Sequence, residues 1–276
     1  MIEHLPEIGV TIFSSWIFNC YLVHDGGAGQ PFVVDVGIPS HARTVVDELG
    51  ARGSDGSALA CALATHGHGD HVGGLLALRS AHAAVPIAFP QGIADLVAGA
   101  PMRTPGPREV AKILPVMADQ PFSMAPLLEL TPLGNKIGYS QQGVHFPFEA
   151  DAWLTEGDTV PGAPDWEVLV TPGHTDDSIS FYNARTRTLL SGDAVLAVGC
   201  RAWFNPEIVD ADLSAKTEDR LRSLDVEHLL PGHGRAVAGP DVLGEALSFR
   251  ERPKDDSLVS SIRRLFGGHR HEPSFR

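Results

Sequence analysis

One short stretch, LATHGHGDHVGG at residues 63–74, places three histidines and one aspartate within six positions. The four residues are His66, His68, Asp70 and His71. The glycines between them permit the tight backbone that such crowding requires. The apolar run before the motif predicts a buried strand, and the residues after it have helical spacing. Imidazole and carboxylate groups gathered at a strand-to-helix turn are typical of a metal site.

The spacing within the motif predicts two neighbouring binding points. His66 and His68 are one residue apart, so on an extended strand end their side chains point the same way and bind one ion. Asp70 and His71 lie beyond the turn, where the chain enters a helix, and face a second point close by.

Three further candidate ligands each follow a predicted strand and have a glycine beside them. They are His174 in VTPGHTDD, Asp193 in LLSGDAV and His233 in LLPGHG. Together with the first motif they give five histidines and two aspartates, enough for two ions that share one carboxylate.

The rest of the chain alternates strands and helices. Strands are predicted at 15–23, 30–37, 58–65, 165–174, 178–184, 187–195 and 226–234, and helices at 40–49, 71–82 and 212–224, with terminal helices at 240–265. Ser40 is the predicted N-cap of the first helix. This order predicts an α/β protein with two sheets covered by helices, in a single domain over residues 1–276.

Residues 100–150 differ in character, with eight prolines and no strong periodicity. One interpretation is a substrate-pocket insertion over the metal edge, in which Met124 and His145 line the pocket together with Trp203 and Phe204. The other is a proline-stiffened excursion that packs on the body of the protein. The sequence leaves both open.

Composition excludes some classes of partner. The net charge of −13 argues against binding a nucleic-acid backbone, and no run approaches the roughly 18 consecutive apolar residues of a membrane helix. Three scattered cysteines and the absence of a recognisable signal sequence predict a cytoplasmic protein without a disulfide framework. We therefore expect a small-molecule substrate, and the oligomeric state is left open.

The ordered motifs THGHGDHVGG, TPGHTDDS, SGDAV and PGHG resemble those of the metallo-β-lactamase superfamily. This resemblance implies an αββα sandwich of two mixed sheets flanked by helices, with a two-metal site at one edge. It implies that the first ion binds His66, His68 and His174, that the second binds Asp70, His71 and His233, and that Asp193 bridges them. Asp35, in VVDVG, resembles the aspartate that supports the metal loop from behind.

Within the superfamily, the ligand pattern is most similar to that of hydroxyacylglutathione hydrolase (glyoxalase II). The expected cofactors are two divalent ions, zinc first, with iron or manganese as alternatives. A water between two such ions loses its proton near neutral pH, which predicts hydrolysis of an ester, thioester or lactone by a bridging hydroxide. Asp70 is the expected catalytic residue, because it is placed to orient that hydroxide and accept its proton.

Departures from the related patterns keep other functions open. Leu196 stands where the resembling lactonases have a tyrosine, and Ala202 stands where glyoxalase II has a basic residue. Asp177 stands where the superfamily commonly has a glycine. Three roles are open for it: a helix cap, a contact that supports the ligands from behind, or a plain surface substitution. The main alternative is a mononuclear iron enzyme similar to persulfide dioxygenases. A lactonase, a nuclease and a non-catalytic binding protein stabilised by structural metal ions are less favoured.

Overall fold

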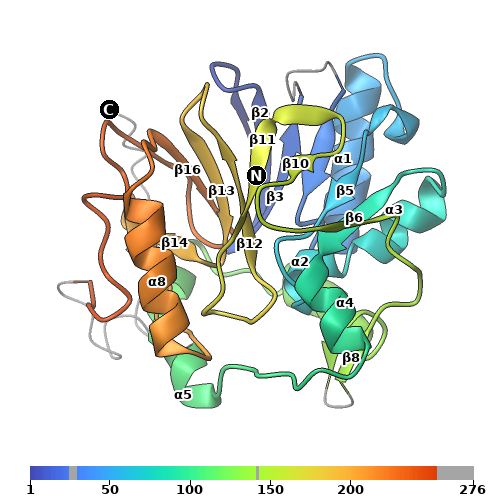
Figure 1. Ribbon diagram of the computed structural model, residues 1–276. Helices are drawn as coiled ribbons and strands as arrows, with labels where there is room; N and C mark the ends of the chain where they lie inside the picture. Colours follow the sequence, from blue (N-terminus) through green and yellow to red (C-terminus); the bar gives the residue numbers. More distant parts are fainter. Residues whose placement is uncertain (25–29, 141–142, 254–276) are drawn as a thin grey trace.

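Two mixed β-sheets lie face to face, and helices cover their outer faces (Figure 1). The structure is a computed structural model, and it describes residues 1–24, 30–140 and 143–253. This arrangement is the αββα sandwich that the resemblance implied. The prediction of the fold class is therefore confirmed.

The first sheet has seven strands in the order β1-β2-β3-β4-β5-β6-β9. Its strands are β1 (Ile2–Leu5), β2 (Val10–Ser15), β3 (Phe18–Val23), β4 (Phe32–Val34), β5 (Ala62–Leu63), β6 (Ile87–Pro90) and β9 (Ala152–Leu154). The first four strands pair antiparallel, and β4, β5, β6 and β9 pair parallel. Parallel neighbours bring the carboxyl ends of β4 and β5 to one edge.

The second sheet has six strands in the order β10-β11-β12-β13-β16-β17. They are β10 (Thr159–Val160), β11 (Ala163–Val170), β12 (Ile179–Asn183), β13 (Thr188–Gly192), β16 (His228–Pro231) and β17 (Val237–Ala238). Only the β13–β16 pair is parallel within this sheet, with Leu190 opposite Leu230. Two small hairpins complete the strands: β7 (Gly138–Ser140) with β8 (Gly143–His145), and β14 (Val195–Val198) with β15 (Arg201–Phe204).

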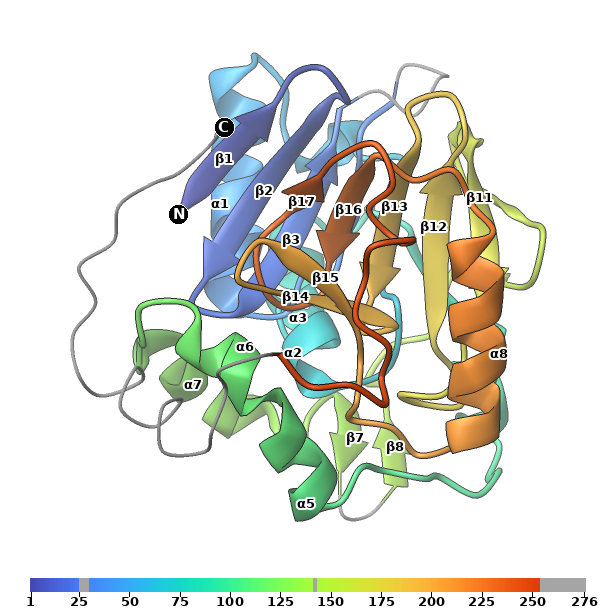
Figure 2. The same cartoon turned by 90° about the vertical axis from the view of Figure 1, so that its left-hand side faces the viewer.

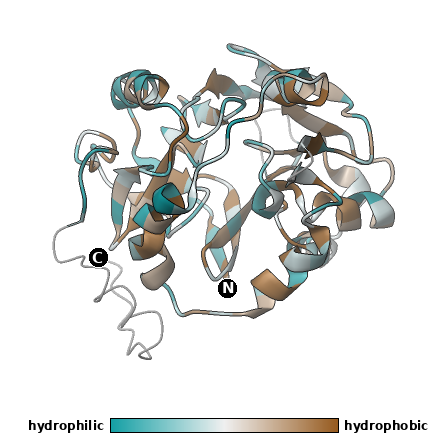
Figure 3. Ribbon diagram, turned by 90° about the horizontal axis from the view of Figure 1, so that it is seen from below, coloured by the Kyte–Doolittle hydropathy of each residue, from teal (hydrophilic) through white to brown (hydrophobic). Residues whose placement is uncertain are grey.

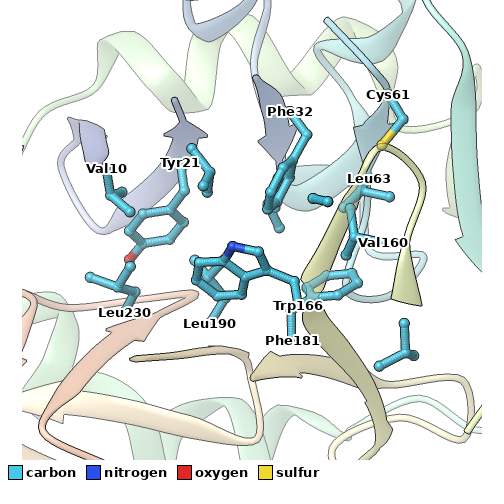
Figure 4. Packing of buried hydrophobic residues seen from close by; sticks show 14 of the residues in the cluster. Val10, Tyr21, Phe32, Cys61, Leu63, Val160, Trp166, Phe181, Leu190 and Leu230 are labelled. Carbon is cyan, nitrogen blue, oxygen red and sulfur yellow. The ribbon is translucent and has the colours of Figure 1, made fainter. Parts of the chain in front are cut away.

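The core between the sheets follows from the two-residue period of the strands. In β3, Tyr21 and Val23 point into the space between the sheets, whereas Cys20 and Leu22 point to the outer helices. Figure 4 shows the inner layer, in which Trp166 of β11 lies among side chains from both sheets. Every residue of β3 is buried because both of its faces are covered.

Helices α1 (Pro39–Ala51) and α3 (Leu75–Ala81) pack on the first sheet, and α8 (Ala211–Arg222) packs on the second (Figures 1 and 2). Helix α8 begins at Ala211, one residue before the predicted start, and the Asp210 side chain caps it by accepting hydrogen bonds from the backbone N–H groups of Asp212 and Leu213. Such an N-cap contributes about 1 kcal/mol to helix stability.

Three local predictions are corrected by the structure. Helix α1 begins at Pro39 with Ile38 as its N-cap, so Ser40 lies inside the first turn. The predicted strand 58–65 is a short 3-10 turn, η1 (Gly56–Ala58), followed by the two-residue strand β5. Residues 240–253 form turns instead of the predicted terminal helix, and 254–265 lie outside the described residues.

Residues 91–133 form a series of consecutive short helices along one edge of the sandwich (Figures 1 and 2). They are α4 (Gln91–Val97), α5 (Pro107–Val110), η2 (Ala111–Ile113), α6 (Leu114–Ala118), α7 (Ala125–Leu130) and η3 (Thr131–Leu133). Figure 3, seen from this edge, shows hydrophobic and hydrophilic stretches side by side along it. Within the described ranges, every helix is too short or too polar to cross a bilayer.

Candidate metal centre

The candidate ligands all follow the carboxyl ends of strands, at the edge where the short helix α2 (Gly69–Val72) lies (Figure 1). We call residues 65–71, which follow β5 and include the first three residues of α2, the histidine loop. It supplies His66, His68, Asp70 and His71. His174 follows β11, Asp193 follows β13 and His233 follows β16. The fold therefore brings residues up to 167 positions apart to one place, because their strands end at the same edge.

The first group consists of His66, His68 and His174. The Nδ1 atom of His68 lies 3.0 Å from His66 Nε2 and 3.1 Å from His174 Nε2. Three imidazole nitrogens thus converge on one point, which is the donor arrangement of a Zn²⁺-type ion.

The second group consists of Asp70, His71 and His233. His233 Nε2 lies 3.3 Å from Asp70 Oδ2, and the donor atoms of the group are within 4.8 Å of one another. The site therefore contains a second set of carboxylate and imidazole donors next to the first.

Asp193 lies between the two groups. Its Oδ1 is 3.5 Å from His71 Nε2, and its Oδ2 is 3.5 Å from His174 Nε2 and 3.3 Å from His233 Nε2. One carboxylate thus faces histidines of both groups. All seven residues that the sequence singled out as ligands are brought together.

Two buried polar atoms in the centre face each other at 3.5 Å without a hydrogen bond in the described residues, which fits a metal ion between them. His71 Nε2 and Asp193 Oδ1 are fully buried and make no hydrogen bond. A buried unpaired polar atom is costly, and a cation between these groups would remove that cost. The donor set of neutral imidazoles and carboxylates therefore fits two divalent ions.

The orientation of four of the histidines is set by a hydrogen bond from Nδ1 to an oxygen outside the centre. The acceptors are Thr65 Oγ1 for His66 (3.1 Å), Asp35 Oδ2 for His71 (2.9 Å), the Glu207 carbonyl for His174 (2.6 Å) and the Ile17 carbonyl for His233 (3.1 Å). A donor role for Nδ1 leaves the lone pair of Nε2 directed at the centre. His68 is different, because its Nδ1 is the atom that faces the others.

Burial and the nearby carboxylates divide the histidines into two classes. Burial lowers the pKa of His68 to about 3 and that of His66 well below its usual value. Burial alone would also lower the pKa of His233, but Asp193 and Asp70 raise it to about 10. The carboxylates therefore stabilise positive charge in the second group. In the absence of divalent ions, a proton on His233 supplies that charge.

Access to the centre is from one side. His66, His71, His174, Asp193 and His233 are buried, whereas His68 and Asp70 are half-buried. The Asp70 side chain is 25% exposed, compared with 5% or less for Asp193 and His233. A ligand from solvent therefore meets Asp70 and His68 first.

Of the residues predicted to line a pocket, Trp203 is placed elsewhere. It is 1% exposed and packs in a hydrophobic cluster with Val116 and Leu196, so the prediction that it adds surface to the pocket is wrong. Phe204 is also buried, and it lines a small cavity together with His174 and Asp193. Met124, at the start of α7, and His145, in β8, are exposed, and their part in a pocket stays a prediction.

Sequence reasoning missed several residues that surround the centre. Tyr139 of β7 packs its ring against the His68 imidazole, with centroids 4.8 Å apart. Asn205 donates from Nδ2 to the Asp193 carbonyl, and the Glu207 carbonyl holds His174. The two carbonyl acceptors belong to backbone, which no side-chain motif marks.

Known metallo-hydrolases are similar to this chain in sequence. The chain is 27% identical over 262 residues to the probable metallo-hydrolase YflN of Bacillus subtilis, a match that covers 88% of this chain and 90% of that protein. It is 31% identical over 185 residues to the hydroxyacylglutathione hydrolase of Cereibacter sphaeroides, which covers 67% of this chain and 50% of the relative. The chain thus spans about half the length of that hydroxyacylglutathione hydrolase.

The fold itself is similar to that of the BLEG-1 B3 metallo-beta-lactamase, with a TM-score of 0.55 and 19% identity over 89% of this chain and 95% of the other. The model of the metallo-beta-lactamase superfamily matches residues 17–233, a range that contains all seven candidate ligands. The chain therefore belongs to the metallo-beta-lactamase superfamily.

Proposed function

We propose that this protein is a binuclear metal-dependent hydrolase that cleaves an ester, thioester or lactone bond. The observation that carries the proposal is the placement of Asp193, whose two oxygens face His71 on one side and His174 and His233 on the other. One buried carboxylate shared by two donor groups is suited to two adjacent ions, of which zinc is the first expectation and iron or manganese the alternatives.

Bound divalent ions supply Lewis acidity at a carbonyl oxygen and lower the pKa of water towards 7. None of the ligand groups in the described residues contains a cysteine, and Cys20 and Cys61 are buried in the hydrophobic cores. With ions bound, the carboxylates of Asp70 and Asp193 would be the groups that orient an attacking water.

Asp70 has the position of a residue that handles the proton of that water. Its carboxylate lies at the accessible side of the centre, 3.3 Å from His233. Burial would raise the pKa of Asp70, but His71 and His233 hold it well below its usual range. The group is thus an ionised acceptor at neutral pH, suited to orient water by accepting its hydrogen bond.

Two contacts of the insertion support its role in shaping the substrate pocket. On one side Tyr139 covers His68. On the other, Phe122 packs edge-on against Trp16 with ring centroids 5.1 Å apart, and Trp16 packs against Phe18, which contacts His233. Aromatic rings next to His68 and His233 favour a substrate with an apolar acyl or leaving group.

The relatives support a hydrolase but leave the bond class to be tested. The name hydroxyacylglutathione hydrolase favours a thioester, but this chain covers only half of such a relative. We therefore keep esters, thioesters and lactones together as the proposed class.

The test is metal analysis followed by a substrate panel. Purified protein loaded with zinc, manganese or iron is assayed on aryl esters, acyl thioesters and lactones, with metal-free protein as the control. We expect two ions per chain and hydrolysis that depends on them. One iron per chain with oxygen uptake on glutathione persulfide would replace this proposal with an oxygenase.

A further inference from the structure

A second buried carboxylate holds the histidine loop, in addition to Asp35. Asp35 Oδ1 accepts a hydrogen bond from the Thr65 backbone N–H (2.8 Å), and Asp177 Oδ2 accepts one from the Gly67 backbone N–H (2.9 Å). Both carboxylates are almost fully buried, at 1% and 3% exposure. Each thus binds the backbone of the residue that directly precedes a histidine of the first group.

Asp177 is joined to the insertion through Tyr139. The Tyr139 hydroxyl donates a hydrogen bond to Asp177 Oδ1, and the Tyr139 backbone N–H donates to the Gly67 carbonyl (3.1 Å). Gly67 therefore has its N–H held by Asp177 and its C=O held by Tyr139. The three residues form a closed hydrogen-bonded triangle.

Close packing leaves this triangle little freedom. A Cβ at Gly67 would lie 2.6 Å from Tyr139 Cε1, and a Cβ at Gly138 would lie 2.6 Å from the Gly67 carbonyl oxygen. On the opposite side, a Cβ at Gly92 of α4 would lie 2.8 Å from Asp177 Cα. Real Cβ atoms do not approach so closely, so the approach of three segments depends on glycine at these positions.

His68 is the histidine that needs such support. The other four are oriented by hydrogen bonds from Nδ1, but Nδ1 of His68 faces His66 and His174. What fixes His68 is the backbone on its N-terminal side, held at Gly67, and the Tyr139 ring, which meets the imidazole at 80°.

We propose that Asp177 and Tyr139 are positioning residues that fix His68, and through it the ion held by His66, His68 and His174. The inference rests on the proposed two-metal function. It also resolves the three alternatives for Asp177 in favour of a contact behind the ligands, because the side chain is buried and bonded to the histidine loop. Asp177 thus holds the backbone before His68 as Asp35 holds the backbone before His66.

The test compares the affinity of the two ions in Asp177→Ala and Tyr139→Phe. Zinc-loaded protein is titrated with a competing chelator, and crystals equilibrated with the chelator give the occupancy of each site from anomalous scattering. We expect the ion at His66, His68 and His174 to bind 10–100-fold more weakly, a range typical of residues that orient ligands, with the ion at Asp70, His71 and His233 unchanged.

Asp176→Asn is the matched control. Asp176 is the adjacent carboxylate, but it pairs with Arg103 near the surface and makes no contact with the histidine loop in the described residues. We expect both ions to bind as in the wild type. If Asp177→Ala does not fold, Tyr139→Phe decides, because it removes one hydroxyl and keeps the ring against His68.

Equal weakening of both ions would overturn the inference, since it would mean a general loss of structure. Wild-type affinity at both sites in Tyr139→Phe and Asp177→Ala would overturn it as well. Failure of the hydrolase proposal would give a different result. The wild-type protein would then bind two ions and cleave none of the panel substrates, while the variants would still weaken the ion at His66, His68 and His174 selectively.

Discussion

Asp35 and His71 form a hydrogen bond of 2.9 Å at the bottom of the metal centre, and each side chain is 1% exposed. The Asp35 carboxylate also accepts hydrogen bonds from the backbone N–H and the hydroxyl of Thr65. It thus fixes the two ends of the histidine loop and, by accepting from His71 Nδ1, keeps the Nε2 lone pair free for an ion.

Asp35→Asn is therefore expected to weaken metal binding by 10–100-fold at the site that contains His71. The new amide would place a donor opposite the Nδ1–H group of His71, which forces the ring to turn or to change tautomer. Metal content after dialysis against a chelator measures the loss. The control is Asp165→Asn, a surface carboxylate paired with Arg185, which should retain its metal. Full metal content in Asp35→Asn would reject the role.

Asp70→Ala is expected to lower hydrolysis by at least about 100-fold while leaving the chain folded. Asp70 is more exposed than Asp193, the other carboxylate of the centre, so its removal leaves only a small gap at the surface. Turnover is measured on the best substrate of the panel, and folding by circular dichroism of metal-free protein. Turnover near the wild-type rate would contradict the assignment of Asp70 as the proton acceptor.

The seven clustered residues could be predicted from the sequence because each is marked locally. His174, Asp193 and His233 each stand beside a glycine directly after an apolar strand, and the histidine loop contains four donors in six positions. Parallel or neighbouring strands that end at one edge then bring such residues together. Short-range signals were sufficient here, since the fold supplies the long-range part.

The supporting residues could not be predicted because their signals are not local. Tyr139 lies 71 residues from His68 in the chain, and nothing around it marks a metal site. The carbonyls of Ile17 and Glu207 have no side-chain signature at all. Trp203 was misplaced because an aromatic strand residue packs equally well in a core or a pocket, and only its tertiary neighbours decide.

Removal of the metal is expected to lower the thermal stability of the protein. Each ion that binds only the folded state at 100 times its Kd adds about 2.7 kcal/mol, which for a chain of this size corresponds to roughly 5–10 °C in Tm per ion. Without the ions, His71 Nε2 and Asp193 Oδ1 remain buried without a hydrogen bond in the described residues. Differential scanning calorimetry with chelator and after readdition of zinc tests this. A Tm that does not respond to verified loss of metal would contradict the fit of the site to ions.

A buried histidine outside the metal centre contributes to the response of the protein to acid. His41 of α1 is 2% exposed, and neither ring nitrogen has a hydrogen-bond partner in the part of the chain that the structure describes. Burial, with a smaller contribution from the N-terminal ammonium of Met1, lowers the pKa of His41 from 6.5 to about 3. Between these pH values the unfolded chain binds a proton at His41 and the folded chain does not, so the free energy of unfolding falls as the pH falls.

His41→Leu should remove this part of the acid sensitivity. Between pH 6 and 4 the free energy of unfolding of the wild type should decrease by up to about 1.4 kcal/mol more per pH unit than that of the variant, because one fewer proton is bound on unfolding. Above pH 7 the two should respond to pH in parallel, since His41 is then neutral in both states. Urea unfolding of metal-free protein at several pH values measures the difference. Parallel curves down to pH 4 would show that His41 takes up its proton in the folded state, against the burial that the structure gives it.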